Sequence, residues 1–156
     1  MVIAEKSLVI EDVMRLLDDK SIKYNELIVE DEKIVQINLV RERKDSDKQF
    51  ISEINITIQD KPKHLFIYCN NVFKIENDSF ITSILQELAE VNLKRIIYGN
   101  MGFDDSDKSI IYTNGVSLAG RKEIIAEELL DYIFYAGFIC EKINLHLDEK
   151  EKSMNL

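Results

Sequence analysis

The spacing of apolar residues along the chain changes from a helical repeat to strand alternation within the first thirty residues. Residues 7–19 (SLVIEDVMRLLDD) carry apolar side chains at helical spacing, with Ser7 placed to cap the first turn. From Ile22 the spacing becomes that of strands, and residues 49–59 (QFISEINITIQ) alternate as a half-buried antiparallel strand does. The predicted strands of this block are 27–30, 33–43, 49–59 and 64–75.

The second half of the chain predicts two further helices separated by a hairpin. Apolar residues repeat at i, i+3 and i+4 in residues 80–91 (FITSILQELAEV). Residues 95–103 (RIIYGNMGF) and 108–116 (KSIIYTNGV) are rich in β-branched and aromatic side chains, which predicts two paired strands. The pattern is helical again over 121–146, and the polar residues 148–156 are expected to form a frayed tail.

The connectors between the first strands decide how these strands pair. EDEK, RKDSDK and QDKPK are too short for a parallel crossover, so consecutive strands must be antiparallel neighbours. Runs of strands followed by helices favour the α+β class over the alternating α/β class. We therefore predict one α+β domain over 1–147, with an antiparallel sheet of about five strands, helices on one face and the order α-β-β-β(-β)-α-β-β-α, followed by a polar tail over 148–156.

Composition narrows the classes of partner. The chain has 156 residues, 46% of them hydrophobic, and a formal net charge of −9. An acidic protein is disfavoured as a binder of nucleic acid or anionic membranes, because both present negative charge. The densest basic stretch, Arg41 to Lys44, is followed at once by Asp45 and Asp47, so a solvated strand end and loop is the favoured interpretation.

The cysteines and the N-terminus bear on the cellular compartment. Cys69 and Cys140 lie far apart in the sequence, each in an apolar run, and isolated cysteines of this kind usually behave as small buried hydrophobes. Residues 1–4 run straight into charged residues without a visible secretory signal. The longest apolar run has about half the length that a membrane-spanning helix needs. These features predict a cytoplasmic protein.

Residues 102–109 (GFDDSDKS) come nearest to a chemical motif. The phosphate-loop pattern G-x-x-x-x-G-K-[ST] requires a glycine where this chain has Asp107, and a helix where strand-like residues follow. A calcium loop of the EF-hand type is also incomplete, because the closing acid is absent. We favour a solvated hairpin turn, and the alternative is a small divalent-ion-binding protein or enzyme that uses Asp104, Asp105 and Asp107.

Other constellations of reactive side chains are incomplete. His64 and His146 lack neighbouring ligands at metal-site spacing, apart from Asp148, which has no second histidine with it. Neither cysteine lies in the glycine-containing, helix-opening context of a nucleophile. The sequence thus predicts a protein that is not an enzyme, with no catalytic residue, metal ligand or cofactor.

The last predicted helix has more apolar surface than one sheet covers. Residues 132–140 (YIFYAGFIC) contain no charged side chain, whereas a helix packed on one sheet shows a stripe of limited width. The second cover is either another part of this chain, a second copy or a partner segment. Gly137 within the run indicates close approach of another element, a bend or a tolerated glycine. The candidate interface residues are Tyr132, Phe134, Tyr135, Phe138 and Ile139.

Several sequence segments, in their order along the chain, resemble those of a known family. The helix IEDVMRLLDDKSIKY, the helix end LAEVN and the hairpin GFDDSDKSIIYTNGVSLAG, in this order, resemble the YbjN-like bacterial proteins, also called sensory transduction regulators, of the type III secretion chaperone-like fold. The resemblance covers residues 8–146. It implies an α-β-β-β-α-β-β-α domain, dimeric and without cofactor, that holds protein partners or influences regulation. The longer meander between Tyr24 and Ile75 departs from the family pattern.

Taken with this resemblance, the sequence predicts a non-catalytic, cytoplasmic bacterial module that is secretion-chaperone-like or regulatory. We expect a homodimer that binds a protein partner, through an exposed sheet face or the aromatic part of the last helix. Nucleic acid and membrane are not expected as partners.

Overall fold

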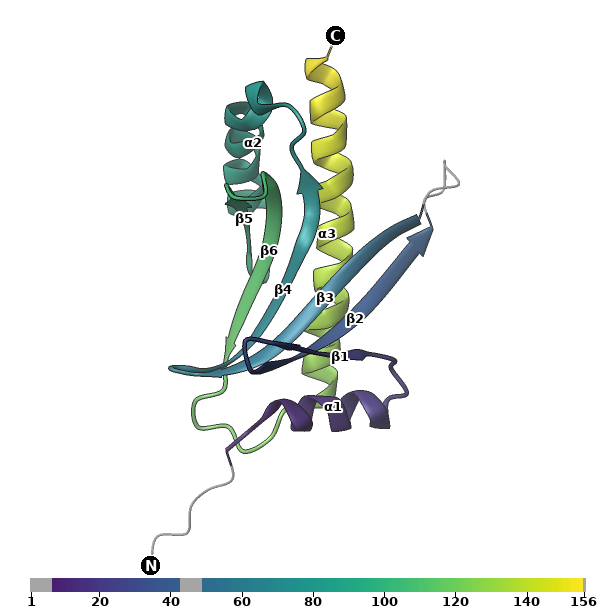
Figure 1. Cartoon of the computed structure of the whole chain (residues 1–156), viewed down its shortest axis with the longest axis vertical. Coiled ribbons are helices and arrows are strands. Elements are labelled where there is room, and N and C mark those ends of the chain that lie inside the picture. The colour runs from purple at the N-terminus through teal and green to yellow at the C-terminus, as the bar shows by residue number, and fades with distance from the viewer. Residues whose placement is uncertain (1–6, 43–48, 156) are drawn as a thin grey trace, which may run out of the picture.

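The computed structural model describes residues 7–42 and 49–155 and confirms the α+β class (Figure 1). Within these residues an open sheet of six antiparallel strands carries three α-helices. The elements in chain order are α1 (Ile10–Asp19), β1 (Asn25–Val29), β2 (Glu32–Glu42), β3 (Gln49–Asp60), β4 (Lys63–Lys74), the short 3-10 helix η1 (Asp78–Phe80), α2 (Ile81–Lys94), β5 (Asn100–Asp104), β6 (Ser109–Ser117) and α3 (Ala126–Met154).

The strands lie in the order β1-β2-β3-β4-β6-β5, so the first four form a meander and the last hairpin adds β6 beside β4. The meander has four strands, the larger of the two predicted numbers, so the sheet has six strands where about five were predicted. The β1–β2 turn is made by Glu30 and Asp31, both with positive φ, at 52° and 65°. Two positive φ values in a two-residue loop match the twist of a tight hairpin.

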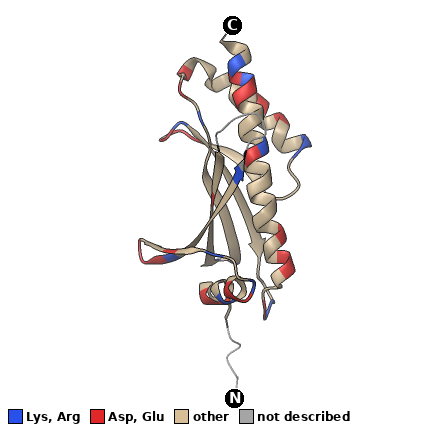
Figure 2. Cartoon of the chain, turned by 90° about the vertical axis from the view of Figure 1, so that its right-hand side faces the viewer, with Lys and Arg blue, Asp and Glu red and all other residues tan. Residues whose placement is uncertain are grey.

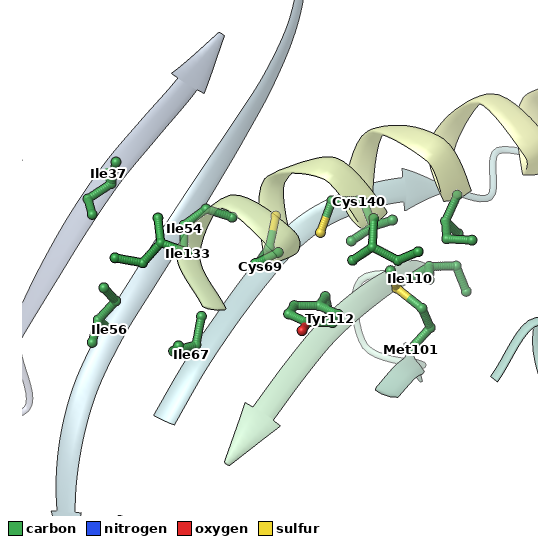
Figure 3. Close-up of a cluster of buried hydrophobic side chains, with 14 of the residues drawn as sticks. Ile37, Ile54, Ile56, Ile67, Cys69, Met101, Ile110, Tyr112, Ile133 and Cys140 are labelled. Carbon is green, nitrogen blue, oxygen red and sulfur yellow. The ribbon is translucent and has the colours of Figure 1, made fainter. Parts of the chain in front are cut away.

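The helices contribute to one hydrophobic core on one face of the sheet. Helix α3 packs along β3 and β4, α1 packs against β2, and α2 packs beside β5 and α3 (Figure 1). Ile54, Ile67 and Ile133 are fully buried in this layer (Figure 3). The opposite face of the sheet carries no helix among the described residues, and we call it the helix-free face.

Helix α1 has a different cap from the predicted one, and a short 3-10 turn leads into α2. Helix α1 starts at Ile10, and Ser7 is not its cap. The Asp12 side chain accepts a hydrogen bond from the Val9 backbone N–H at 2.8 Å, which satisfies a donor that the helix leaves open. Before α2, the Asn77 side chain accepts from the Ser79 backbone N–H and so starts the η1 turn.

The strand predicted over 95–103 starts only at Asn100. Gly99 has φ +85° and lies so close to the neighbouring strand that a Cβ atom there would stand 2.3 Å from the Thr113 carbonyl oxygen. The Asn92 side chain both donates to and accepts from the Met101 backbone, each at 2.8 Å, and so ties α2 to β5. Residues 95–99 are therefore a loop.

Helix α3 starts later and ends later than expected, at Ala126 and Met154, so the expectation of a frayed tail from residue 148 is wrong. One side of this end packs inward, because Met154 contacts the core. An ion pair between Lys152 and Asp148, at 3.0 Å, adds support along the helix surface. None of the described helices is both long and apolar enough to cross a membrane.

Candidate functional site

The acidic hairpin tip uses its aspartates within its own turn. Asp104 accepts hydrogen bonds from the Ser106 backbone N–H and hydroxyl, at 3.0 and 2.6 Å. The side-chain bond from Ser106 is the main reason that the pKa of Asp104 is lowered. Asp105 pairs with Lys108 at 2.9 Å, and Asp107 accepts from the Ser109 hydroxyl at 3.2 Å.

These bonds give the tip the geometry of a turn between β5 and β6, as the sequence favoured. Asp and Ser side chains commonly stabilise turns in this way. Across residues 7–42 and 49–155, no three His, Cys, Asp or Glu side chains lie close enough together to hold a metal ion.

The structure brings together two cysteines that the sequence treated as isolated. Cys69 on β4 and Cys140 on α3 are fully buried, and their side chains meet between helix and sheet (Figure 3). The adjacent Cys140 thiol is the main cause that lowers the pKa of Cys69. The same proximity, together with burial, raises the pKa of Cys140. A sequence separation this long carries no local signal of the contact.

Three of the five candidate residues on α3 are covered by the chain itself. Ile139 is 2% exposed and lies in the core. Tyr132 and Tyr135 both pack edge-on against Tyr98 of the 95–99 loop, with ring centroids 5.2 Å apart in each pair. The Tyr135 hydroxyl also accepts a hydrogen bond from the Ile97 backbone N–H at 2.8 Å. The 95–99 loop is thus the second cover for this part of the helix.

Phe134 and Phe138 remain uncovered, with 49% and 45% of their surfaces exposed. They are one helical turn apart on the side of α3 that faces away from the sheet. The guanidinium of Arg41 and the ammonium of Lys142 lie 5.7 and 5.6 Å from the centroid of the Phe138 ring. Arg41 is held there by an ion pair with Glu141 at 3.3 Å.

The charges along this side of α3 differ at its two ends. The N-terminal turns carry the exposed Glu127 and Asp131, the middle is apolar, and Lys142 follows (Figure 2). Neither Asp131 nor Lys142 forms an ion pair with any described residue of the chain. We call this surface the outer stripe of α3, and it consists of Glu127, Asp131, Phe134, Phe138, Lys142 and Leu145.

Gly137 lies on the inner side of the same helix, where β2 approaches it. A Cβ atom at this position would stand 2.5 Å from the Cδ1 atom of Leu39. Of the explanations that the sequence left open, close approach of another element is the one observed.

A second exposed surface lies on the helix-free face. His64, Phe66 and Tyr68 alternate along β4, and successive ring centroids lie 6.1 and 5.3 Å apart. The Phe66 and Tyr68 rings are stacked with an interplanar angle of 27°. We call these three residues the aromatic stripe of β4. Their alternation was visible in the sequence and one face without helices was predicted, but the sequence did not indicate that the aromatic side chains of β4 lie on that face.

The structure describes only the first two residues of the basic stretch Arg41 to Lys44. Arg41 lies at the end of β2 beside α3. Arg43 and Lys44 lie outside the described residues.

Comparison of the chain with protein-family models and with curated proteins finds no match. The resemblance to the YbjN-like proteins therefore stays a prediction, which rests on the order of the elements and on the sequence segments quoted above.

Proposed function

We propose that this chain is a non-catalytic protein-binding module that acts as a homodimer, with the outer stripe of α3 as the dimer contact. The observation that carries the proposal is the pair Phe134 and Phe138, which stay half-exposed in the middle of a helix whose other aromatic residues are covered. Exposed aromatic side chains that sit together on one face favour an interface. The order of elements supports a secretion-chaperone-like or regulatory role in the bacterial cytoplasm.

A second copy suits this stripe because the stripe is complementary to itself. In a two-fold antiparallel helix pair, positions equally far from the axis on either side face each other. With the axis beside Ala136, Phe134 faces Phe138 of the second copy, and Asp131 approaches Lys142 of the second copy. Asp131 and Lys142, which form no ion pair with the described residues of their own chain, thereby gain oppositely charged partners.

The exposed surface of Phe134 and Phe138 sets how strongly the two copies can associate. Covering the exposed half of one phenylalanine contributes about 1 kcal/mol, so the four rings of a symmetric pair contribute about 4 kcal/mol. Association costs at least about 4 kcal/mol in lost freedom of motion. The ion pairs between Asp131 and Lys142 must supply the remainder, and we expect a dimer that dissociates on dilution.

Light scattering and sedimentation at several protein concentrations test the dimer. The wild-type chain should show a mass that rises with concentration toward twice that of the chain. Phe134→Glu should remain monomeric, because it places a charge at the apolar centre of the contact. Leu93→Glu is the matched control, since Leu93 is 82% exposed on α2, outside the outer stripe. A wild-type chain that is monomeric at every concentration refutes the proposal.

A charge exchange tests the orientation of the two helices. Asp131→Lys and Lys142→Asp should each weaken self-association, because each places like charges opposite one another. The double variant should associate again, and a mixture of the two single variants should form a mixed dimer. If the mixture stays monomeric while the wild-type chain dimerises, the antiparallel orientation is wrong.

A further inference from the structure

The helix-free face has an uncharged centre that runs across the whole sheet. The strand register places Tyr68 in one row with one residue from each of the other five strands, and no member of this row carries a charge. The neighbouring rows pair Phe66 with Thr57 and Gly115, and His64 with Gln59 and Ser117. The row of Tyr68 consists of Asn25, Gln36, Asn55, Tyr68, Thr113 and Asn100.

The aromatic stripe of β4 stands at the middle of this surface. Its three rings are half-buried, so each keeps an accessible part. Gly115 opposite Phe66 has no side chain to cover the stripe, and a Cβ atom there would already contact the His64 ring at 3.7 Å. In Figure 2, α3 lies on the right of the sheet and the middle parts of the strands are largely uncharged.

Acidic side chains lie at both ends of this uncharged surface. By strand alternation Glu32 shares the side of Gln36, and Glu53 shares the side of Asn55. Burial is the main cause that raises the pKa of the Tyr68 hydroxyl, and the nearby carboxylate of Glu32 raises it further. Glu53 accepts a hydrogen bond from the Asn71 side chain at 3.4 Å, and neither acid is ion-paired with a described residue.

One polar group on this face also lacks a partner. The Thr57 hydroxyl is buried beside Phe66 and has no hydrogen-bond partner in the described part of the chain. A buried polar group without a partner is uncommon, because leaving it unpaired costs free energy. Because this hydroxyl has almost no accessible surface, it belongs to the buried base of the face and not to the surface that a partner can contact.

We propose that the aromatic stripe of β4 is the docking surface for a basic, extended segment of a partner protein. Lys or Arg side chains of this segment stack on the Phe66 and Tyr68 rings and reach Glu32 and Glu53 at the two ends. Cations bind aromatic faces and carboxylates together, and the rows beside the stripe contain no competing Lys or Arg. This inference rests on the proposed role as a protein-binding module and names the chemistry of its partner.

Titration of the full chain with labelled synthetic peptides tests the proposal by fluorescence anisotropy. The probe is a Lys-Ser repeat peptide, and a Glu-Ser repeat of equal length is the comparison. The Lys-Ser peptide should bind and the Glu-Ser peptide should not. Equal binding of both peptides, or binding of a neutral oligosaccharide in place of the Lys-Ser peptide, overturns the proposal.

Three variants locate the binding surface. Tyr68→Ala should weaken binding of the Lys-Ser peptide by about tenfold, since it removes one stacking ring. Glu32→Gln should weaken it by about two- to fivefold and leaves the fold intact, because Glu32 is exposed. Glu26→Gln is the matched control, because Glu26 on β1 is also exposed and points to the other side of the sheet.

If Glu26→Gln weakens peptide binding as much as Glu32→Gln does, the peptide binds the acidic chain without using this surface. The inference then fails. Amide chemical shifts mapped by NMR should change along β4 and its neighbours in the row of Tyr68. The monomeric Phe134→Glu variant should still bind the peptide. A wild-type chain that binds the peptide but stays monomeric at every concentration would overturn the dimer alone, whereas a wild-type dimer that does not bind the peptide would overturn this inference alone.

Discussion

Replacing Gly137 by alanine sets two opposing effects against each other in one helix. Alanine is favoured over glycine in a helix interior by about 1 kcal/mol. The new methyl group, however, would stand 2.5 Å from the Cδ1 atom of Leu39, well inside van der Waals contact. Overpacking of this kind typically costs about 1 to 3 kcal/mol. The contacted atom is the far end of a partly buried leucine side chain, which can rotate away, so the cost lies at the low end of this range, at about 1 kcal/mol. This cost offsets the gain of about 1 kcal/mol, and we expect Gly137→Ala to leave the free energy of unfolding nearly unchanged.

The Leu39→Ala background separates the two effects. Removal of the Leu39 side chain deletes the atom that the new methyl group meets, so Gly137→Ala should there raise the free energy of unfolding by about 1 kcal/mol. Urea unfolding of the four proteins, at one protein concentration, measures both values and their difference. If Gly137→Ala is equally stabilising in both backgrounds, the close approach of β2 to α3 is wrong.

Three further predictions concern the interior and the last helix. Asn92→Ala should lower the free energy of unfolding by about 1 to 3 kcal/mol and speed amide exchange at Met101, because it removes both bonds that hold β5. Cys69 and Cys140 should react with a thiol reagent only on unfolding, since both are buried; fast labelling of the native protein would contradict their position. The pKa of Glu151 is raised above 4.5, mainly by burial, so the folded state binds this proton more tightly than the unfolded chain. The resulting stabilisation is present at pH below 4.5 and is lost as pH rises through the folded pKa, so Glu151→Gln should stabilise the protein at neutral pH in thermal unfolding.

Periodicity identified the elements correctly where one side of an element is buried and the other is not. The alternating residues 49–59 form β3, which spans Gln49–Asp60, and residues 80–91, with their i, i+3, i+4 repeat, include most of α2, which spans Ile81–Lys94. Both patterns are local, because the face that a side chain takes follows from its position in the repeat. The short connectors set the antiparallel pairing for the same reason.

Element ends were less predictable because they depend on contacts between distant residues. The strand expected from residue 95 begins at Asn100, since Asn92 and the close approach at Gly99 set its start. The polar end of α3 stays helical to Met154, since Met154 reaches the core. No pattern within either segment carries this information.

The sequence by itself determined the α+β class and the excess of apolar surface on the last helix, because both follow from the local order of apolar and polar residues. Only the tertiary structure decided that Tyr98 covers Tyr132 and Tyr135, while Phe134 and Phe138 stay exposed. It also decided which face of the sheet stays free of helices. The physical reason is that a side chain is covered only when a segment far away in the sequence packs against it. Which segment does so is set by the packing of the whole fold rather than by the neighbours along the chain.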